Sequence, residues 1–203
     1  LTINGQKMSK SRGTFITARK YLEHLDPDYL RYYFAAKLNN NIEDLDFNIN
    51  DFVDRVNADL IGKVINIASR CAGFIEKRFD GYLGESLPDM VLFKSLVDGH
   101  KDICESFEHR EFSKAIRQIM AFADKVNQYI NQEQPWTIAR EAGQDSQLHG
   151  ICTLGLNLFR IIMIWLSPVT PQLALKSSDF LRCPIDIQSM ETISVPLLNH
   201  RIS

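Results

Sequence analysis

The residues with the clearest chemical potential are two lysines, three positions apart, near the beginning of the chain. Lys7 and Lys10 lie in a short Lys/Ser stretch between Gly5 and Gly13. Glycine lets a backbone bend, and the lysine ammonium is a compact charge on a flexible stem. Such a loop suits a polyanion that is held for part of a reaction cycle, for example a triphosphate whose charge moves onto a leaving group. The alternative is a solvated basic loop without a ligand.

The stretch is identical to KMSKS, the second signature of class I aminoacyl-tRNA synthetases. In that family the loop closes over ATP, and its lysines stabilise the pyrophosphate leaving group while the aminoacyl-adenylate forms. The resemblance implies that Lys7 and Lys10 are catalytic and that the loop binds ATP, which is used with Mg²⁺. The implied ATP-binding residues are Lys7, Met8, Ser9, Lys10 and Ser11.

The other ATP motif of the class, His-x-Gly-His, does not occur in the 203 residues. The chain therefore resembles the C-terminal part of such an enzyme, without its main catalytic domain. We expect the chain alone to lack aminoacylation and ATP–pyrophosphate exchange activity, because two lysines cannot position a carboxylate for attack on ATP.

Composition sets broad limits on the protein class. Hydrophobic residues make up 45% and charged residues 24%, which is ordinary for a globular protein, and the net charge is −2. Any RNA contact must therefore come from the local placement of Arg and Lys. The four cysteines are widely spaced, which argues against a zinc site or a disulfide framework and favours a cytosolic protein. No metal ligands are predicted, and the longest apolar run is too short to span a membrane.

Residues 1–48 are predicted to form a small α/β module. Thr17 can cap a helix to about Leu25, and Asp26, followed by Pro27, can cap a second helix to about Leu38. Residues 42–47 alternate like an edge strand. We expect the aromatic residues of the second helix to be structural, and the resemblance implies that the module bears on the inner corner of a tRNA.

Residues 49–181 are predicted to form a bundle of about five helices, so that the fold class is mainly α. The first helix is unusually long, from Asn50 to about Phe79, with an apolar stripe. The stripe consists of Val53, Val56, Leu60, Val64, Ile67, Cys71 and Phe74. The other long helices are expected over about 88–107, 111–130, 145–166 and 167–181, and a short one follows Pro135. Residues 182–203 are expected to form an extended tail.

A polar face lies opposite this apolar stripe if the whole helix has 3.6 residues per turn. The face consists of Asp59, Gly62, Asn66, Arg70, Gly73 and Lys77. Asn66 and Arg70 are one turn apart, so an amide and a guanidinium point the same way. An amide can pair with a base edge, and a guanidinium can contact a base or a phosphate. The alternative is an ordinary solvated helix face.

Trp136 directly follows Pro135 in a linker between helices, outside any apolar stripe. An indole in this position could stack on an unpaired base. The alternative is a buried lid on the bundle.

The sequence around these residues resembles the methionyl-tRNA synthetase family. The likeness rests on Arg55 to Asp59, Asn66 to Arg70, Pro135-Trp136 and, near the end, Pro196 to Leu198. In that family an Asn, an Arg four residues later and a Trp after a Pro recognise the methionine anticodon. The resemblance implies these roles for Asn66, Arg70 and Trp136, and a tail that returns toward the catalytic domain. The dimerisation domain that some members carry is not found in the sequence.

The leading hypothesis is therefore the tRNA-recognition part of a cytoplasmic methionine–tRNA ligase. Its expected partners are methionine tRNA and, through the missing catalytic domain, ATP and methionine; no membrane is expected. Two alternatives stay open at this point. One is the anticodon domain of another class I synthetase, and the other is a non-catalytic RNA-binding or scaffold bundle.

Overall fold

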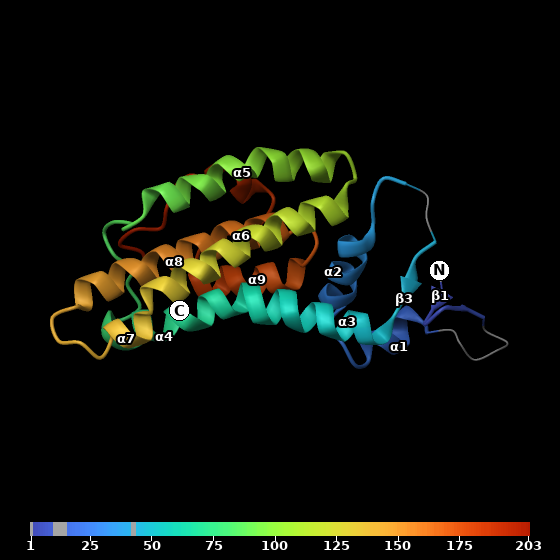
Figure 1. Ribbon diagram of the computed structural model, residues 1–203, viewed down its shortest axis with the longest axis horizontal. Helices are drawn as coiled ribbons and strands as arrows, with labels where there is room; N and C mark the ends of the chain where they lie inside the picture. The colour runs from blue at the N-terminus through green and yellow to red at the C-terminus, as the bar shows by residue number, and fades with distance from the viewer. Residues whose placement is uncertain (1, 10–15, 42–43) are drawn as a thin grey trace.

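Figure 1 shows the computed structural model of the chain, in which residues 2–9, 16–41 and 44–203 are described. A small N-terminal module lies at one end of a helical bundle, whose helices run side by side. The bundle helices are α3 (Ile49–Arg55), α4 (Asn66–Arg78), α5 (Met90–Glu108), α6 (Phe112–Glu133), α8 (Asp145–Leu166) and α9 (Pro171–Leu181). The predicted mainly α fold is confirmed.

The N-terminal sheet has the strand order β2 (Gln6–Lys7), β1 (Thr2–Ile3), β3 (Asp46–Phe47). β1 pairs antiparallel with β2 and parallel with β3. Asn4 and Gly5 both have positive φ, 48° and 76°, as a tight two-residue hairpin turn requires. Of the edge strand predicted over 42–47, Asp46–Phe47 form β3, and residues 44 and 45 are not in a strand; residues 42 and 43 lie outside the described part of the chain.

Both helix starts in the module form as predicted. Thr17 accepts a hydrogen bond from the Lys20 backbone N–H and caps α1 (Ala18–Leu22), which ends three residues before the expected Leu25. Asp26 accepts from the Asp28 N–H and caps α2 (Pro27–Lys37).

Two side chains of α2 fasten the module to the bundle. Asp28 is buried, and its carboxylate accepts a 2.7 Å hydrogen bond from the Leu173 N–H in the first turn of α9. Burial raises the pKa of Asp28, and this backbone hydrogen bond partly opposes the rise. Arg31 donates to the carbonyls of Val169 and Pro168, each at 2.9 Å. The module is therefore held to the turn between α8 and α9 by charge-assisted hydrogen bonds.

The long first helix of the bundle is continuous but not regular. Between α3 and α4, Val56–Ile65 forms a π-helix, η1, whose hydrogen bonds skip one more residue than those of an α-helix. The apolar stripe therefore shifts with respect to a uniform 3.6-residue wheel. Val53, predicted to be buried, is 45% exposed, whereas Phe52 is buried in its place.

α8 is the central helix of the bundle, and its bounds are those predicted from the sequence. Every residue from Ile151 to Leu166 is buried. By length and composition the helix could cross a membrane, with a mean hydropathy of 1.5, but 89% of that window is buried inside the bundle. Its apolar character is therefore accounted for by packing within the bundle.

The residues after α8 close that helix and do not begin the next one. The hydroxyls of Ser167 and Thr170 bond to the carbonyls of Ile164 and Leu166 in its last turn. α9 therefore starts at Pro171 and not at the predicted Ser167. Proline is favoured at this position because a backbone N–H in the first turn of a helix has no acceptor within the helix, so nothing is lost when it is absent.

The tail after α9 contains a 3₁₀-helix, η2 (Gln188–Thr192), and runs along α8. Asn157 of α8 bonds to both the N–H and the carbonyl of Leu197. The tail then pairs with the segment after α4, where Leu83 donates to His200 and Ile202 donates to Gly81. Within this chain the tail ends far from the N-terminal sheet (Figure 1), and its return toward a catalytic domain stays a prediction.

A buried indole–imidazole contact makes the stability of the bundle depend on pH. Trp165 of α8 donates its indole N–H to Nδ1 of His100 on α5 at 3.2 Å, and burial lowers the pKa of His100. A protonated imidazole cannot accept this bond, and the unfolded chain binds the proton more readily. The free energy of unfolding should therefore fall as the pH drops through about 6.5, the ordinary histidine pKa.

His100→Gln removes the titrating group, and thermal melting from about pH 7.5 to pH 5 would test this expectation. The variant should lose less stability over this range than the wild type does. Equal losses in both proteins would contradict the assignment to His100.

Candidate nucleic-acid interface

The three residues predicted to contact an anticodon lie together at the end of the bundle farthest from the module. Asn66 and Arg70 are on successive turns of α4, and Trp136 is in the short helix α7 (Pro135–Ile138). The guanidinium carbon of Arg70 lies 4.7 Å from the centre of the Trp136 ring. This distance is typical of a cation–π contact.

Two asparagines of α6 orient the polar side chains of α4. The Asn66 side-chain amide donates to Asn127 Oδ1 at 3.3 Å, and Arg70 donates to Asn131 Oδ1. Asn127 in turn donates to the Lys63 carbonyl at 3.0 Å. Sequence reasoning missed both asparagines. The available signal was their four-residue spacing just before the Pro-Trp pair, which places them on one helix face.

These contacts form a regular ladder between two parallel helices. Asn66 with Asn127, Arg70 with Asn131, and Lys63 with Asp124 are each separated by 61 positions. A constant separation means that the two helices run in the same direction in register. The side chains are therefore held in fixed positions, which lowers the entropy lost when a ligand binds.

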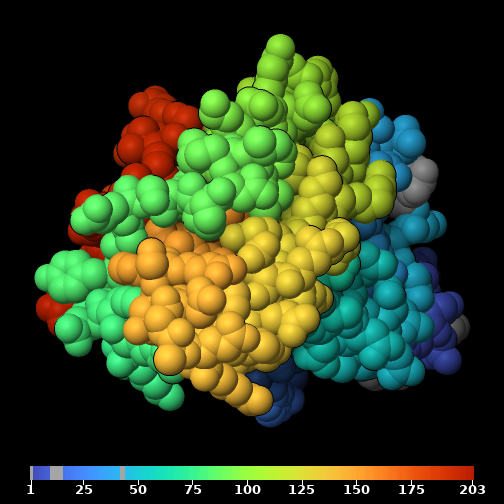
Figure 2. Space-filling model, turned by 60° about the vertical axis from the view of Figure 1, so that its left-hand side comes forward, coloured from blue at the N-terminus to red at the C-terminus, as the bar shows by residue number. Residues whose placement is uncertain are grey.

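Trp136 is neither a fully buried lid nor a free surface residue. Its side chain is partly buried against the hydrophobic core, and the preceding Pro135 is buried. Gln134 has a φ of 47°, in the left-handed region, and turns the chain sharply between α6 and α7. The turn sets the indole beside the α4–α6 ladder. Figure 2 shows the surface of α6 and α7 in yellow, between the start of α8 in orange and residues of α3 and η1 in teal.

The predicted polar face is only partly an outward face. The carboxylate of Asp59 accepts a 2.7 Å bond from the buried Tyr32 of α2 and lies 3.9 Å from Lys63. Gly73 is open, with no atom within 4 Å of an added Cβ, and Lys77 is exposed. The polar surface next to Arg70 therefore continues toward the end of α4.

The KMSKS stretch lies at the other end of the molecule. Lys7 ends β2 and is exposed, while Met8 and Ser9 are partly buried. Lys10 and Ser11, also predicted to bind ATP, lie outside the described residues. Asp46 supports the hairpin that carries the loop, since it accepts hydrogen bonds from the Thr2 hydroxyl and the Gly5 N–H. These bonds hold the pKa of Asp46 below its usual value.

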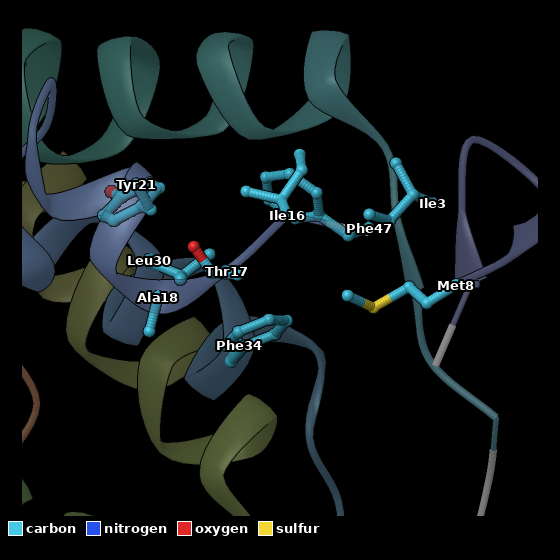
Figure 3. Close-up of a pocket in the computed structure, with 9 residues that line it drawn as sticks. All are labelled: Ile3, Met8, Ile16, Thr17, Ala18, Tyr21, Leu30, Phe34 and Phe47. Carbon is cyan, nitrogen blue, oxygen red and sulfur yellow. The ribbon is translucent and has the colours of Figure 1, made fainter. Parts of the chain in front are cut away.

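Met8 anchors the beginning of the loop on an apolar pocket of about 190 Å³ between the sheet, α1 and α2. Figure 3 shows its side chain directed into the pocket, toward Phe34 and Phe47. Met8 is therefore tied by packing to α2, which Asp28 fastens to the bundle. Within residues 2–9, 16–41 and 44–203 no group of three or more His, Cys, Asp or Glu could hold a metal ion.

Comparison with known families gives two matches along the chain. The model for class I tRNA synthetases (M) matches residues 1–72, and the model for the anticodon binding domain of methionyl tRNA ligase matches residues 83–191. The second match alone covers more than half of the chain. Together they favour the methionyl-tRNA synthetase family over the family of another class I synthetase and over a scaffold bundle.

Solved structures have the same fold. Mycobacterium tuberculosis methionyl-tRNA synthetase in complex with methionyl-adenylate aligns with a TM-score of 0.85 at 22% identity, over 99% of this chain and 41% of that one. A second structure bound by methionyl-adenylate gives 0.86 at 23% identity, over 97% and 40%. The apo form gives 0.79 at 20%, over 92% and 39%. The chain thus spans about 40% of the length of these structures.

Proposed function

The chain belongs to the methionyl-tRNA synthetase family, and from this premise we propose that it is the tRNA-recognition part of a methionine–tRNA ligase. The whole enzyme would activate methionine with ATP and transfer it to methionine tRNA in the cytoplasm. In this proposal residues 1–48 carry the ATP loop and contact the tRNA stem, residues 49–181 bind the anticodon, and residues 182–203 form the tail.

The observation that carries the proposal is the contact between Arg70 and Trp136 beside Asn66, at the end of the bundle. An unpaired base could stack on the indole or on the outer plane of the guanidinium, and the amide of Asn66 could pair with a base edge. Asn127 and Asn131 hold the amide and the guanidinium in place before RNA arrives. These groups together supply both stacking and hydrogen-bond recognition, which base-specific binding needs.

In the whole enzyme the lysines of the loop would act on ATP. Their ammonium groups would offset the negative charge that develops on the leaving pyrophosphate, and Mg²⁺ bound with ATP would neutralise part of the triphosphate charge. Lys7 is exposed at the end of a strand that is fixed by the hairpin and by Met8. This anchoring supports a role in which the loop moves over ATP from a defined hinge.

Trp136→Ala is expected to weaken the binding of methionine tRNA by about 1–3 kcal/mol, the usual contribution of one stacked base. Folding stability should fall less than for a fully buried tryptophan, because Trp136 is only partly buried. A tRNA titration beside a thermal melt measures both effects. Trp136→Phe is the matched control, since it keeps an aromatic face and should retain most of the affinity.

Arg70→Ala separates base recognition from general attraction to phosphate. If the guanidinium contacts a base, the variant should bind methionine tRNA less tightly and also discriminate less against a tRNA altered only in its anticodon. Unchanged discrimination in Arg70→Ala, together with a badly destabilised Trp136→Ala, would contradict the proposed anticodon site.

A further inference from the structure

A polar pocket lies between the long first helix and α6, nearer the N-terminal module than the Asn66, Arg70 and Trp136 site. It has a volume of about 280 Å³ and lies where α2, the long first helix and α6 meet. Its polar lining among the described residues consists of Arg55, Asp59, Lys63, Arg117 and Asp124. The pocket shares no lining residue with the Asn66, Arg70 and Trp136 site, but it lies between the same two helices.

The side chains that the two helices bring together differ on the two sides of the Lys63–Asp124 pair. Where the separation is 61 positions, each contact joins complementary groups: an ammonium with a carboxylate, an amide with an amide, a guanidinium with an amide oxygen. Toward the module, Arg55 of α3 and Arg117 of α6 line the same pocket as Lys63 and Asp124. Two guanidinium groups therefore line one pocket at this level of the ladder.

Arg55, Asp59 and Lys63 follow one another at four-residue steps. They therefore lie on one side of the long first helix, and all three line the pocket.

The carboxylates near the two guanidinium groups already have other partners. Asp124 pairs with Lys63 at 2.9 Å, and Asp59 accepts the 2.7 Å bond from Tyr32 and lies 3.9 Å from Lys63. Asp51 pairs with Lys37 at 2.6 Å and lies 3.8 Å from Arg55.

Both guanidinium groups therefore retain unused hydrogen-bond donors. The Nε of Arg55 is buried without a hydrogen-bond partner. Arg117 is exposed and has neither a hydrogen bond nor an ion pair with any residue in the described part of the chain.

We propose that Arg55 and Arg117 bind a backbone phosphate of the RNA whose anticodon contacts Arg70 and Trp136. This inference rests on the proposed function and extends it to a contact that does not depend on base sequence. A guanidinium has a planar fork of donors that fits phosphate oxygens, and an unpaired buried donor is costly unless a ligand satisfies it. The pocket lies between the anticodon site and the stem-contact module, along the path of an RNA that touches both.

The test is the salt dependence of tRNA binding by Arg117→Ala in the full chain. Loss of one phosphate contact should weaken binding roughly tenfold and lower the slope of log K against log salt by about 1. The loss should be equal for methionine tRNA and for a tRNA altered in its anticodon, because the contact is to the backbone. Arg117→Lys should recover part of the affinity, since it keeps the charge but loses the fork.

Lys94→Ala is the matched control, because it removes one exposed positive charge on α5, outside the pocket. It should change neither the affinity nor the salt slope by a comparable amount. Wild-type affinity and slope in Arg117→Ala, alongside weakened binding in Arg70→Ala, would overturn this inference and leave the proposed function intact. If the wild-type chain binds no tRNA at all, the proposed function fails first.

Discussion

Trp165→Ala is expected to lower the free energy of unfolding by about 3–5 kcal/mol, the usual cost of removing a large aromatic side chain from a core. Trp165 is 0% exposed at the centre of the bundle. Its ring lies 5.3 Å from that of Phe122, and its N–H bonds to His100. The substitution therefore leaves a cavity and also leaves the His100 acceptor without its donor. Urea unfolding followed by circular dichroism measures the loss.

Trp165→Phe separates the two contributions, because it keeps most of the ring volume and removes only the N–H. Its loss of stability should be clearly smaller than that of the alanine variant. tRNA affinity of the folded Trp165→Ala protein should be close to wild type, since the residue lies far inside the bundle. A stability loss no larger than that of Trp136→Ala would show that α8 is not the centre of the folding core.

Lys10→Ala, made in the longer protein that includes the nucleotide-binding domain, is expected to slow adenylate formation by about a hundredfold. The proposed role of the ammonium is to stabilise charge that develops on the leaving phosphate, so its loss should act on the chemical step. Loss of one such interaction typically costs about 3 kcal/mol of transition-state stabilisation. The dissociation constant of methionine should change little. Pre-steady-state adenylate formation gives the rate.

Lys20→Ala provides the control for a general effect of charge near the loop. Lys20 is an exposed lysine of α1 that pairs with Glu23, and it lies outside the KMSKS stretch. Its removal should leave the rate of adenylate formation unchanged. A Lys10→Ala enzyme with a normal rate but a raised methionine dissociation constant would mean that the loop binds substrate without stabilising the leaving group.

The two proposed functional regions lie at opposite ends of the molecule (Figure 1). Met8 packs the beginning of the loop on α2, and Asp28 joins α2 to the first turn of α9. The Arg55–Arg117 pocket lies beside α2.

Elements with local signals could be predicted directly from the amino-acid sequence. The starts of α1 and α2 follow from Thr17, Asp26 and Pro27, because side-chain caps and a first-turn proline act within three residues. The bounds of α8 follow from a long apolar segment between polar ends. The likeness to one synthetase family selected Asn66, Arg70 and Trp136 as candidates before any geometry was known.

Features that depend on contacts between distant segments could not be predicted in this way and follow from the folded structure. A wheel with a fixed 3.6-residue period assigned Val53 to the buried side, whereas Val53 is exposed and Phe52 is buried, because Val56–Ile65 forms a π-helix. The start of α9 moved to Pro171, because the hydroxyls before it are used to close α8. The register of two parallel helices brings Asn127 to Asn66 and places Arg55 and Arg117 in the lining of one pocket. Segments some 61 positions apart acquire a register only when the core between them packs, so no periodicity within either helix could specify it.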